Sequence, residues 1–449
     1  MGRHENDRPI DLLVIGGGMA GLTAAARVVD QGGCAVVVER APELGGSARL
    51  AGYLHTAADA DDLFEADPGA DAPLQRQLVE GFPAAVEWVR TLGVDCGPEV
   101  PVLRLTRGHL IATDSYVDVC GSIVANGDGS TVILGATTSQ LIVEDESVRG
   151  AIVTSKDGEH ELRARWTLLA TGGFQGDAQL VGERIHSNGA AMQLRSNPYS
   201  RGEGLRLAMA SGADSGPAGA MFYGHLVPSG VAFADPADYT AFSQYHSDHG
   251  LLFNIDGRRF VDETLGDHVN ATFTVEQPEG RALLVVDQRV RNRWMLTPLV
   301  EGMPPPVDRF ELARKRGGRV GVANDVDEFQ YLPEDWGFPG AVIAESLHAY
   351  NDAARRGLPL VPSRRLDATP LVDPPYYVMD VSAAITFTYG GVRIDSSARV
   401  LDPNGRPVPG LLAAGADAGG TFSRDYAGGL ANAAVFGLRA AQTVLGSSH

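Results

Sequence analysis

The sequence predicts an α/β fold of two domains, one built from both ends of the chain and one inserted between them. Near the N-terminus, an apolar strand, a glycine-rich turn and a helical stretch follow one another directly at residues 11–29. Strands and glycine turns return from residue 376, and residues 430–445 form an apolar, alanine-rich stretch typical of a buried helix. Between these segments the chain carries mixed short elements, many prolines and scattered aromatic residues, which indicates a separate domain.

We place the domain boundaries where this composition changes. Residues 1–218 and 375–449 are expected to form the first domain, and residues 219–374 an α+β cap domain that binds the substrate. At 449 residues the chain is long enough for two hydrophobic cores.

Composition and charge exclude several classes of function. The formal net charge of −19 argues against nucleic acid and anionic membranes as partners, because both require a positive surface. No apolar run approaches the ~20 residues of a membrane helix, and we expect a cytoplasmic protein. Cys34, Cys96 and Cys120 are far apart and belong to no ligand motif, so we expect neither a disulfide framework nor a metal site.

A dinucleotide-binding motif occupies the first strand–turn–helix segment. The run Gly16–Gly21 fits the pattern GxGxxG, with Met19 and Ala20 between its last two glycines. Gly16 permits the tight turn, Gly18 lets the backbone approach a pyrophosphate, and Gly21 lets the helix pack on the strand. Glu39 ends the next strand, where its carboxylate can accept hydrogen bonds from ribose hydroxyls. This pattern predicts a Rossmann-type domain.

Further glycine turns distinguish FAD from NAD as the cofactor. Glu39 is followed by Arg40 and then by the turn at Gly46-Ser47, and two later strands run into the turns Ala170-Thr171-Gly172 and Ala414-Gly415. Together these segments resemble the flavoprotein family of fumarate reductases, 3-ketosteroid dehydrogenases and tricarballylate dehydrogenases. The resemblance runs over nearly the whole chain and is strongest at residues 11–50, 166–174, 250–263 and 384–441.

The resemblance implies how the chain holds one FAD. The Gly46-Ser47 turn would lie by the isoalloxazine ring, and Leu430 and Ala431 would offer backbone N–H groups to the flavin O2 edge. Members of the family often carry an acidic residue directly after the Ala-Ala-Gly turn, whereas here Ala416 takes that position and Asp417 follows. Ser47 lies near where covalently attached types place a histidine, so we expect non-covalent FAD.

The resemblance also implies the chemistry: a hydride moves between a carbon and flavin N5, and a proton moves at the adjacent carbon beside a carbonyl. In fumarate reductases a histidine and an arginine near the C-terminus hold the substrate carboxylates. Phe387 and Tyr426 replace them here, which removes the bidentate fork for a dicarboxylate. Tyr426 resembles the tyrosine that polarises the carbonyl in steroid enzymes. Its alternative role is to pack on the flavin.

Four further residues are candidates for the proton transfer, each with a purely structural alternative. Asp267 and His268 stand where steroid enzymes carry a catalytic tyrosine, a few residues after the segment Gly257–Glu263. Arg291 matches the arginine acid of fumarate reductases, and His225 a cap histidine near the substrate.

We therefore expect an FAD-dependent enzyme that desaturates a C–C bond next to a carbonyl, or reduces the corresponding enone. Its small-molecule substrate would be a neutral or mildly polar ketone, which includes cyclic ketones. The sequence does not identify the electron acceptor. A tricarballylate-like acid dehydrogenase is the first alternative. A flavoprotein tailoring enzyme or partner without C–C redox chemistry is the second.

Overall fold

The structure, a computed structural model, describes residues 8–298, 300 and 307–447. The chain divides into two compact units. Unit 1 comprises Met1–Leu180, Ser196–Phe222 and Phe387–His449, and unit 2 comprises Val181–Arg195 and Tyr223–Thr386. The segment Val181–Arg195, which the sequence assigned to the first domain, packs with unit 2. The reason is that its strand pairs with the central strand of that unit.

Unit 1 is organised around a mostly parallel sheet in the order β17-β18-β9-β1-β2-β6. Its strands are β1 (Ile10–Ile15), β2 (Ala35–Glu39), β6 (Thr131–Leu134), β9 (Gly158–Leu169), β17 (Arg399–Leu401) and β18 (Pro407–Ala413). All strand pairs from β18 to β6 are parallel, so their carboxyl ends meet at one edge of the sheet. The valine-rich β2 is buried along its whole length, as expected of a central parallel strand.

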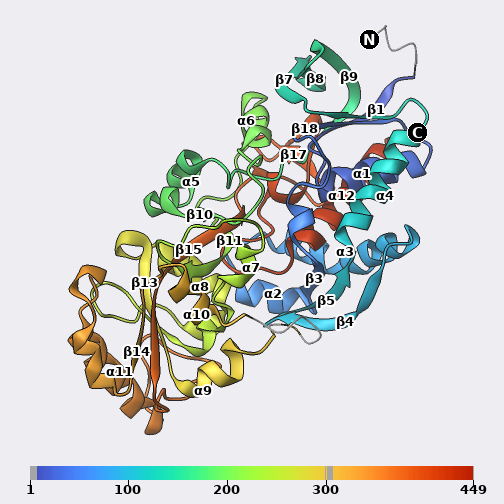
Figure 1. Cartoon of the computed structure of the whole chain (residues 1–449). Coiled ribbons are helices and arrows are strands. Elements are labelled where there is room, and N and C mark those ends of the chain that lie inside the picture. The colour runs from blue at the N-terminus through green and yellow to red at the C-terminus, as the bar shows by residue number, and fades with distance from the viewer. Residues whose placement is uncertain (1–7, 299, 301–306, 448–449) are drawn as a thin grey trace. The chain divides into compact units, whose positions relative to one another are not determined.

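The two chain ends meet inside unit 1. Helix α1 (Met19–Asp30) packs against α12 (Gly429–Gly446), and Figure 1 shows the blue and red segments interleaved there. Gly437 allows this close approach, because a Cβ atom at this position would lie 2.7 Å from the Ala20 carbonyl oxygen. The C-terminal helix therefore belongs to the same core as the N-terminal glycine turn.

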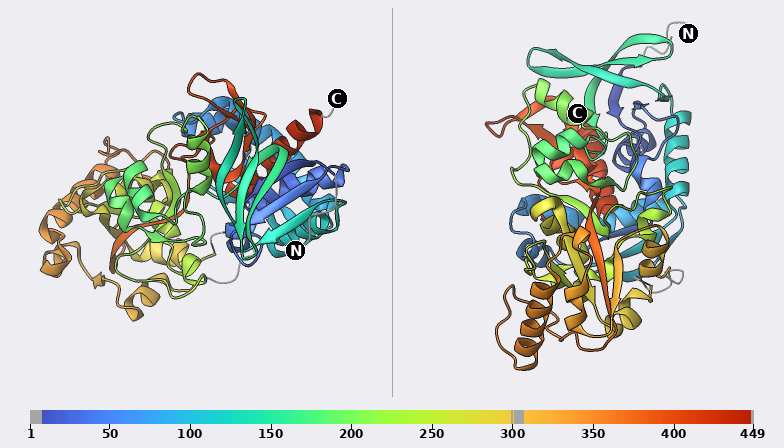
Figure 2. Two further views of the ribbon diagram at one scale, coloured as in Figure 1. Left: turned by 90° about the horizontal axis from the view of Figure 1, so that it is seen from above. Right: turned by 60° about the vertical axis from the view of Figure 1, so that its left-hand side comes forward.

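A small antiparallel layer extends from the sheet of unit 1. It consists of β7 (Thr137–Glu144) and β8 (Ser147–Ser155) with the first half of β9, and Figure 2 shows it at the edge of the unit. The neighbouring strand β6 does not belong to this layer, because it pairs in parallel with β2. A strand of four residues carries too little pattern to show its partner.

The remaining elements of unit 1 surround the sheet. Asp71 caps α3, as its place before Pro73 predicts, by accepting a hydrogen bond from the Leu74 N–H. The composition of α4 (Thr113–Asn126) does not indicate a helix, because the segment is rich in β-branched residues and contains a glycine. These elements are α2 (Ala60–Ala66), α3 (Ala72–Thr91), α4 (Thr113–Asn126), α6 (Glu203–Ala210), β3 (Tyr53–Ala57), β4 (Cys96–Leu103), β5 (Thr106–Ile111), β16 (Val392–Arg393) and β19 (Ala418–Gly419).

Unit 2 contains a six-stranded mixed sheet centred on the long strand β15 (Tyr376–Thr388), which pairs with β10, β11, β13 and β14. The other strands are β10 (Gln193–Leu194), β11 (Phe222–Pro228), β12 (Leu251–Phe253), β13 (Arg281–Val286) and β14 (Val320–Ala323). The helices are α7 (Asp238–Ala241), α8 (Asp267–Val275), α9 (Gln288–Val290), α10 (Arg309–Lys315) and α11 (Gly340–Arg355), and α5 (Ala178–Arg184) begins in unit 1 and ends in unit 2. No helix within the described parts of the chain has both the length and the apolar character of a membrane span.

Candidate functional site

The glycine turn between β1 and α1 has the geometry that its sequence predicts. Gly16 adopts a φ of +109°, and a Cβ atom there would lie 2.2 Å from the Ala170 carbonyl oxygen. A Cβ atom at Gly21 would lie 2.1 Å from the Gly16 oxygen, so only glycine allows this helix to start so close to the strand. Gly18 occupies the N-cap with no side-chain cap, which leaves the N–H groups of Met19 and Ala20 available to a phosphate.

Glu39 supports this turn from the end of β2. Its two carboxylate oxygens accept hydrogen bonds of 2.7 Å from the Gly17 N–H and from the Ala41 N–H. The neighbouring Arg40 forms an ion pair of 2.6 Å with Glu203. The predicted ribose acceptor therefore also fixes the backbone of the glycine turn, which is a function the sequence pattern does not show.

The turns after β9 and β18 are tied together by Asp417. This carboxylate accepts hydrogen bonds of 2.5 Å from the Thr171 N–H, 3.0 Å from the Thr171 hydroxyl and 3.0 Å from the Gly173 N–H. Asp417 is 1% exposed, and burial raises the pKa of its carboxyl to about 6 against these three hydrogen bonds. Asp417 thus bonds to the turn that contains Ala170 and Gly172, and its carboxylate holds the turns after β9 and β18 in a fixed relation to each other.

The Gly46-Ser47 turn has polar support that sequence reasoning missed. The Ser47 hydroxyl lies 2.7 Å from the Ser196 hydroxyl and accepts a hydrogen bond of 2.5 Å from the Asn197 side chain. Gly46 has a φ of +52°, which favours glycine. The signal in the sequence was the Ser-Asn-Pro run at 196–198, which lies about 150 residues away from the turn that it contacts.

The N-terminus of α12 and the Tyr426 side chain form the third part of the site. Gly428 precedes the helix without a side-chain cap, and the first turn holds no acidic residue, so the N–H groups of Leu430 and Ala431 suit a negatively polarised edge. The Tyr426 hydroxyl accepts a hydrogen bond of 2.8 Å from the Gly429 N–H.

Aromatic rings surround Tyr426. Its ring centroid lies 5.5 Å from that of His55, 5.8 Å from Phe387 and 5.6 Å from Phe422. Tyr389 extends the cluster, with its ring 5.7 Å from Phe387. The two positions that distinguish this chain from fumarate reductases therefore lie side by side.

These features fit an FAD. Three helices of unit 1, α1, α6 and α12, begin at glycines without capping side chains, whereas α2, α3 and α10 are capped by aspartates. In α6 the Gly204 N–H already donates to the Thr171 hydroxyl, which leaves α1 and α12 as the ends suited to a cofactor. A pyrophosphate and the polar edge of a flavin are the groups that such uncapped helix ends accept. The glycines at 16, 46 and 415 all have positive φ and border the same carboxyl-end edge of the sheet. Within the described residues, no group of three His, Cys, Asp or Glu side chains is arranged to hold a metal ion.

In unit 2, three of the predicted proton-transfer residues come together. His225 on β11 bonds through Nδ1 to Asp267, the first residue of α8, and His268 Nδ1 lies 3.9 Å from the other oxygen of the same carboxylate. Burial is the main cause that lowers the pKa of His225 to about 4. Burial would raise the pKa of Asp267, but the attraction of His225 and hydrogen bonds from both histidines lower it below its usual range.

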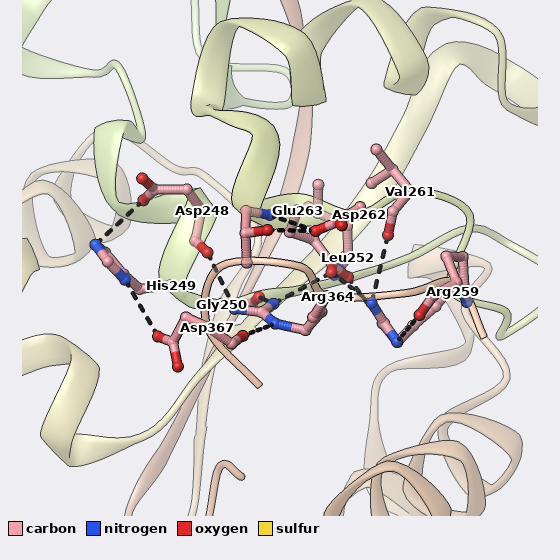
Figure 3. Close-up of polar contacts among 12 residues, drawn as sticks. Asp248, His249, Gly250, Leu252, Arg259, Val261, Asp262, Glu263, Arg364 and Asp367 are labelled. Atoms are coloured by element: carbon pink, nitrogen blue, oxygen red, sulfur yellow. Dashed lines mark hydrogen bonds and ion pairs between the residues drawn. The ribbon is translucent and has the colours of Figure 1, made fainter. Parts of the chain in front are cut away.

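Within the described residues, Arg291 and Glu263 form ion pairs with other residues of unit 2 and have no hydrogen bond to the two histidines and the aspartate described above. Both terminal nitrogens of Arg291 bond to Asp308, the N-cap of α10, which favours the structural alternative for this arginine. Glu263 is fully buried and accepts hydrogen bonds of 2.6 Å from Arg259 and 3.1 Å from Arg364. Figure 3 shows the two guanidinium groups on either side of this carboxylate. Their contacts support the fold of unit 2 rather than a movable proton.

The architecture and the uncapped helix ends define a flavoprotein of the dinucleotide-binding class. The family model described as "FAD binding domain" matches residues 11–430. The chain belongs to this family of FAD-dependent oxidoreductases, whose enzymes act on CH–CH groups.

Individual relatives are distant. Fumarate reductase 1 of Saccharomyces cerevisiae is 26% identical over 487 residues, covering 96% of this chain and 98% of that protein. The vinyl phenol reductase of Lactiplantibacillus plantarum is 23% identical over 452 residues, covering 93% and 91%. The fold is similar to that of a 3-ketosteroid-Δ4-(5α)-dehydrogenase from Rhodococcus jostii solved with 4-androstene-3,17-dione, with a TM-score of 0.76, 20% identity and 98% of both chains covered.

Proposed function

We propose that this protein desaturates a C–C bond next to a carbonyl, or reduces the corresponding enone, on a neutral or mildly polar ketone. FAD, held non-covalently, supplies the N5 position that accepts or donates the hydride. Tyr426 donates a hydrogen bond to the substrate carbonyl as negative charge develops on its oxygen. The glycine turn, Glu39 and the first turn of α12 hold the cofactor.

The observation that carries this proposal is the environment of Tyr426. A phenol surrounded by His55, Phe387 and Phe422 presents one directed donor beside apolar ring surface. That combination suits a ring ketone better than a dicarboxylate, which needs paired cationic donors. Two of the similar proteins, the vinyl phenol reductase and the ketosteroid dehydrogenase, are named for compounds without a carboxylate.

One observation favours an acidic substrate as the second candidate. Arg195 in unit 2 is 8% exposed and donates hydrogen bonds to four neutral acceptors: the Tyr239 carbonyl, Ser243, Thr386 and the Tyr245 hydroxyl. A buried guanidinium bonded to neutral oxygens retains its full charge for an anion. A tricarballylate-like acid would use that charge.

Reoxidation of the reduced flavin distinguishes these candidates. The holoenzyme is photoreduced without oxygen and mixed with cyclohexenone, with 4-androstene-3,17-dione or with fumarate, and the return of the oxidised flavin absorbance is followed. We expect the enones to reoxidise the flavin and fumarate to leave it reduced. Reoxidation by fumarate alone would favour the acid, and failure of the whole panel would favour a tailoring enzyme or partner.

A further inference from the structure

Tyr223, His225 and Asp267 form a continuous hydrogen-bonded chain in unit 2. Tyr223 and His225 are two positions apart on β11, so their side chains share one face of the strand. The Tyr223 hydroxyl lies 3.0 Å from Nε2 of His225, and Nδ1 of the same imidazole bonds to Asp267. Each group in this chain can pass a proton to the next.

The charge on Asp267 determines where the protons of this chain reside. The lowered pKa of Asp267 keeps its carboxyl ionised at neutral pH, and an ionised carboxylate only accepts hydrogen bonds. We therefore assign the imidazole hydrogen to Nδ1 of His225. Nε2 is then the acceptor, and the Tyr223 O–H is the donor.

Within this hydrogen-bonded chain, the pair formed by His225 and Asp267 is buried and the Tyr223 phenol is more exposed. His225 is 1% exposed and Asp267 is 4% exposed, whereas Tyr223 is only half-buried. With a pKa of about 4, His225 is neutral at pH 7 and able to accept a proton. Other polar or charged groups near the imidazole are His268, Tyr245 and Arg195.

Chain connectivity links Tyr223 to the segment that carries Tyr426. Met221, two residues earlier, belongs to unit 1, where its N–H donates to the Ser423 carbonyl and its own carbonyl accepts from the Tyr389 N–H. Two residues of extended chain span at most about 7 Å, so the backbone of Tyr223 stays that close to Met221. Ser423 precedes Tyr426 by three positions.

We propose that Tyr223 is the catalytic residue that exchanges the proton with the substrate carbon, with His225 as its base and Asp267 as the anchor of the imidazole. This inference rests on the proposed function. In the desaturation direction, the C–H proton next to the carbonyl moves to the Tyr223 oxygen while the phenol hydrogen moves to Nε2. The electron pair of that C–H bond becomes the C=C bond as the neighbouring carbon loses its hydride to the oxidised FAD.

The displaced proton is retained until it is released to solvent. It converts His225 to an imidazolium that is paired with the Asp267 carboxylate, and the Tyr223 phenol is restored. Reduction of an enone follows the same path in reverse.

The variants Tyr223→Phe and Tyr245→Phe test this relay. Tyr245 is the matched control, since its ring lies 4.9 Å from the His225 ring while its hydroxyl bonds to Arg195. Each holoenzyme is mixed in heavy water with cyclohexanone, dihydrotestosterone or succinate. Flavin reduction and deuterium exchange at the carbon next to the carbonyl are then measured.

We expect Tyr223→Phe to retain its FAD and to lose on the order of 10²-fold or more in both rates. The Tyr245→Phe variant should stay within a few-fold of wild type. Exchange and flavin reduction at wild-type rates in Tyr223→Phe would overturn the proposal, because a structural phenol would not be needed for proton removal.

A second readout separates failure of the relay from failure of the proposed function. If no probe reduces the flavin and none exchanges its hydrogen for deuterium in the wild-type holoenzyme, the proposed ketone function is wrong. The relay is then tested by NMR of the histidine ring nitrogens. A shift of the His225 Nε2 resonance in Tyr223→Phe, absent in Tyr245→Phe, supports the assigned proton positions. An unchanged resonance overturns the relay independently of any substrate.

Discussion

The hydroxyl oxygen of Tyr426 accepts a hydrogen bond of 2.8 Å from the backbone N–H of Gly429, the first residue of α12. The phenol oxygen thereby supplies a hydrogen-bond acceptor to one of the N–H groups that have no partner within the helix. A hydroxyl that accepts such a bond becomes a stronger donor, because hydrogen bonds in series polarise one another. The same contact fixes the direction in which the phenol can donate.

Replacing Tyr426 by phenylalanine should remove this donor while keeping the ring in its aromatic cluster. If the phenol acts mainly in the transition state, kcat should fall by on the order of 10²–10³ with FAD content unchanged. Tyr389→Phe is the control, because that phenol belongs to the same cluster and its ring packs on Phe387. Wild-type flavin reduction in Tyr426→Phe would leave this tyrosine with a packing role only.

The flavin should be released by acid precipitation, giving a yellow supernatant and a colourless pellet. In the proposed site, backbone N–H groups, glycine turns and the carboxylate of Glu39 would hold the cofactor without a covalent bond. A flavin that stays with the pellet would show covalent attachment and contradict this expectation.

Glu39→Arg should weaken FAD binding, because it replaces an acceptor for the ribose with a cation and leaves the Gly17 N–H without its present partner. Loss of a hydrogen bond to a charged group costs about 1.5–3 kcal/mol, so the dissociation constant should rise by roughly 10- to 150-fold. Glu39→Gln, which keeps one acceptor oxygen, should lie between this variant and wild type. Titration of the apoprotein with FAD measures both, and an unchanged constant in Glu39→Arg would show that the residue makes no contribution to cofactor binding.

The sequence predicts the glycine turn so well because each of its glycines meets a local steric requirement. The contact between Glu39 and Gly17 joins residues 22 positions apart, and that between His225 and Asp267 joins residues 42 apart. Composition and spacing carry no information on such contacts, since the first depends on the way β1 and β2 pair and the second on the way β11 and α8 pack. Tyr223 could have been found from its i, i+2 spacing with His225 on a predicted strand.

Glu263→Gln should destabilise unit 2 without removing the cofactor. The substitution leaves the guanidinium groups of Arg259 and Arg364, whose side chains are 6% and 2% exposed, without their shared anion. Breaking a buried ion pair by removing one partner costs about 3–5 kcal/mol. Glu279→Gln is the control, because that side chain is 59% exposed and should change stability by no more than about 0.5 kcal/mol. Equal denaturation midpoints for the two variants would contradict a structural role for Glu263.

Asp417 should make the stability of the protein depend on pH. Its pKa is raised to about 6 in the folded protein and returns to the usual value of about 4 on unfolding. The folded state therefore binds the proton more tightly. The stabilisation is complete below about pH 4 and is lost as the pH rises through about 6. Two pKa units correspond to about 3 kcal/mol, which is the upper limit of the effect.

The variant Asp417→Asn isolates that contribution, because the amide resembles the protonated acid and does not titrate. Urea unfolding of both holoproteins at several pH values between about 4 and 7 should show the variant gaining up to about 3 kcal/mol relative to wild type as the pH rises. Parallel curves would show that the three hydrogen bonds from Thr171 and Gly173 keep the carboxylate ionised throughout. In that case Asp417 would act as a fixed anion between the two turns.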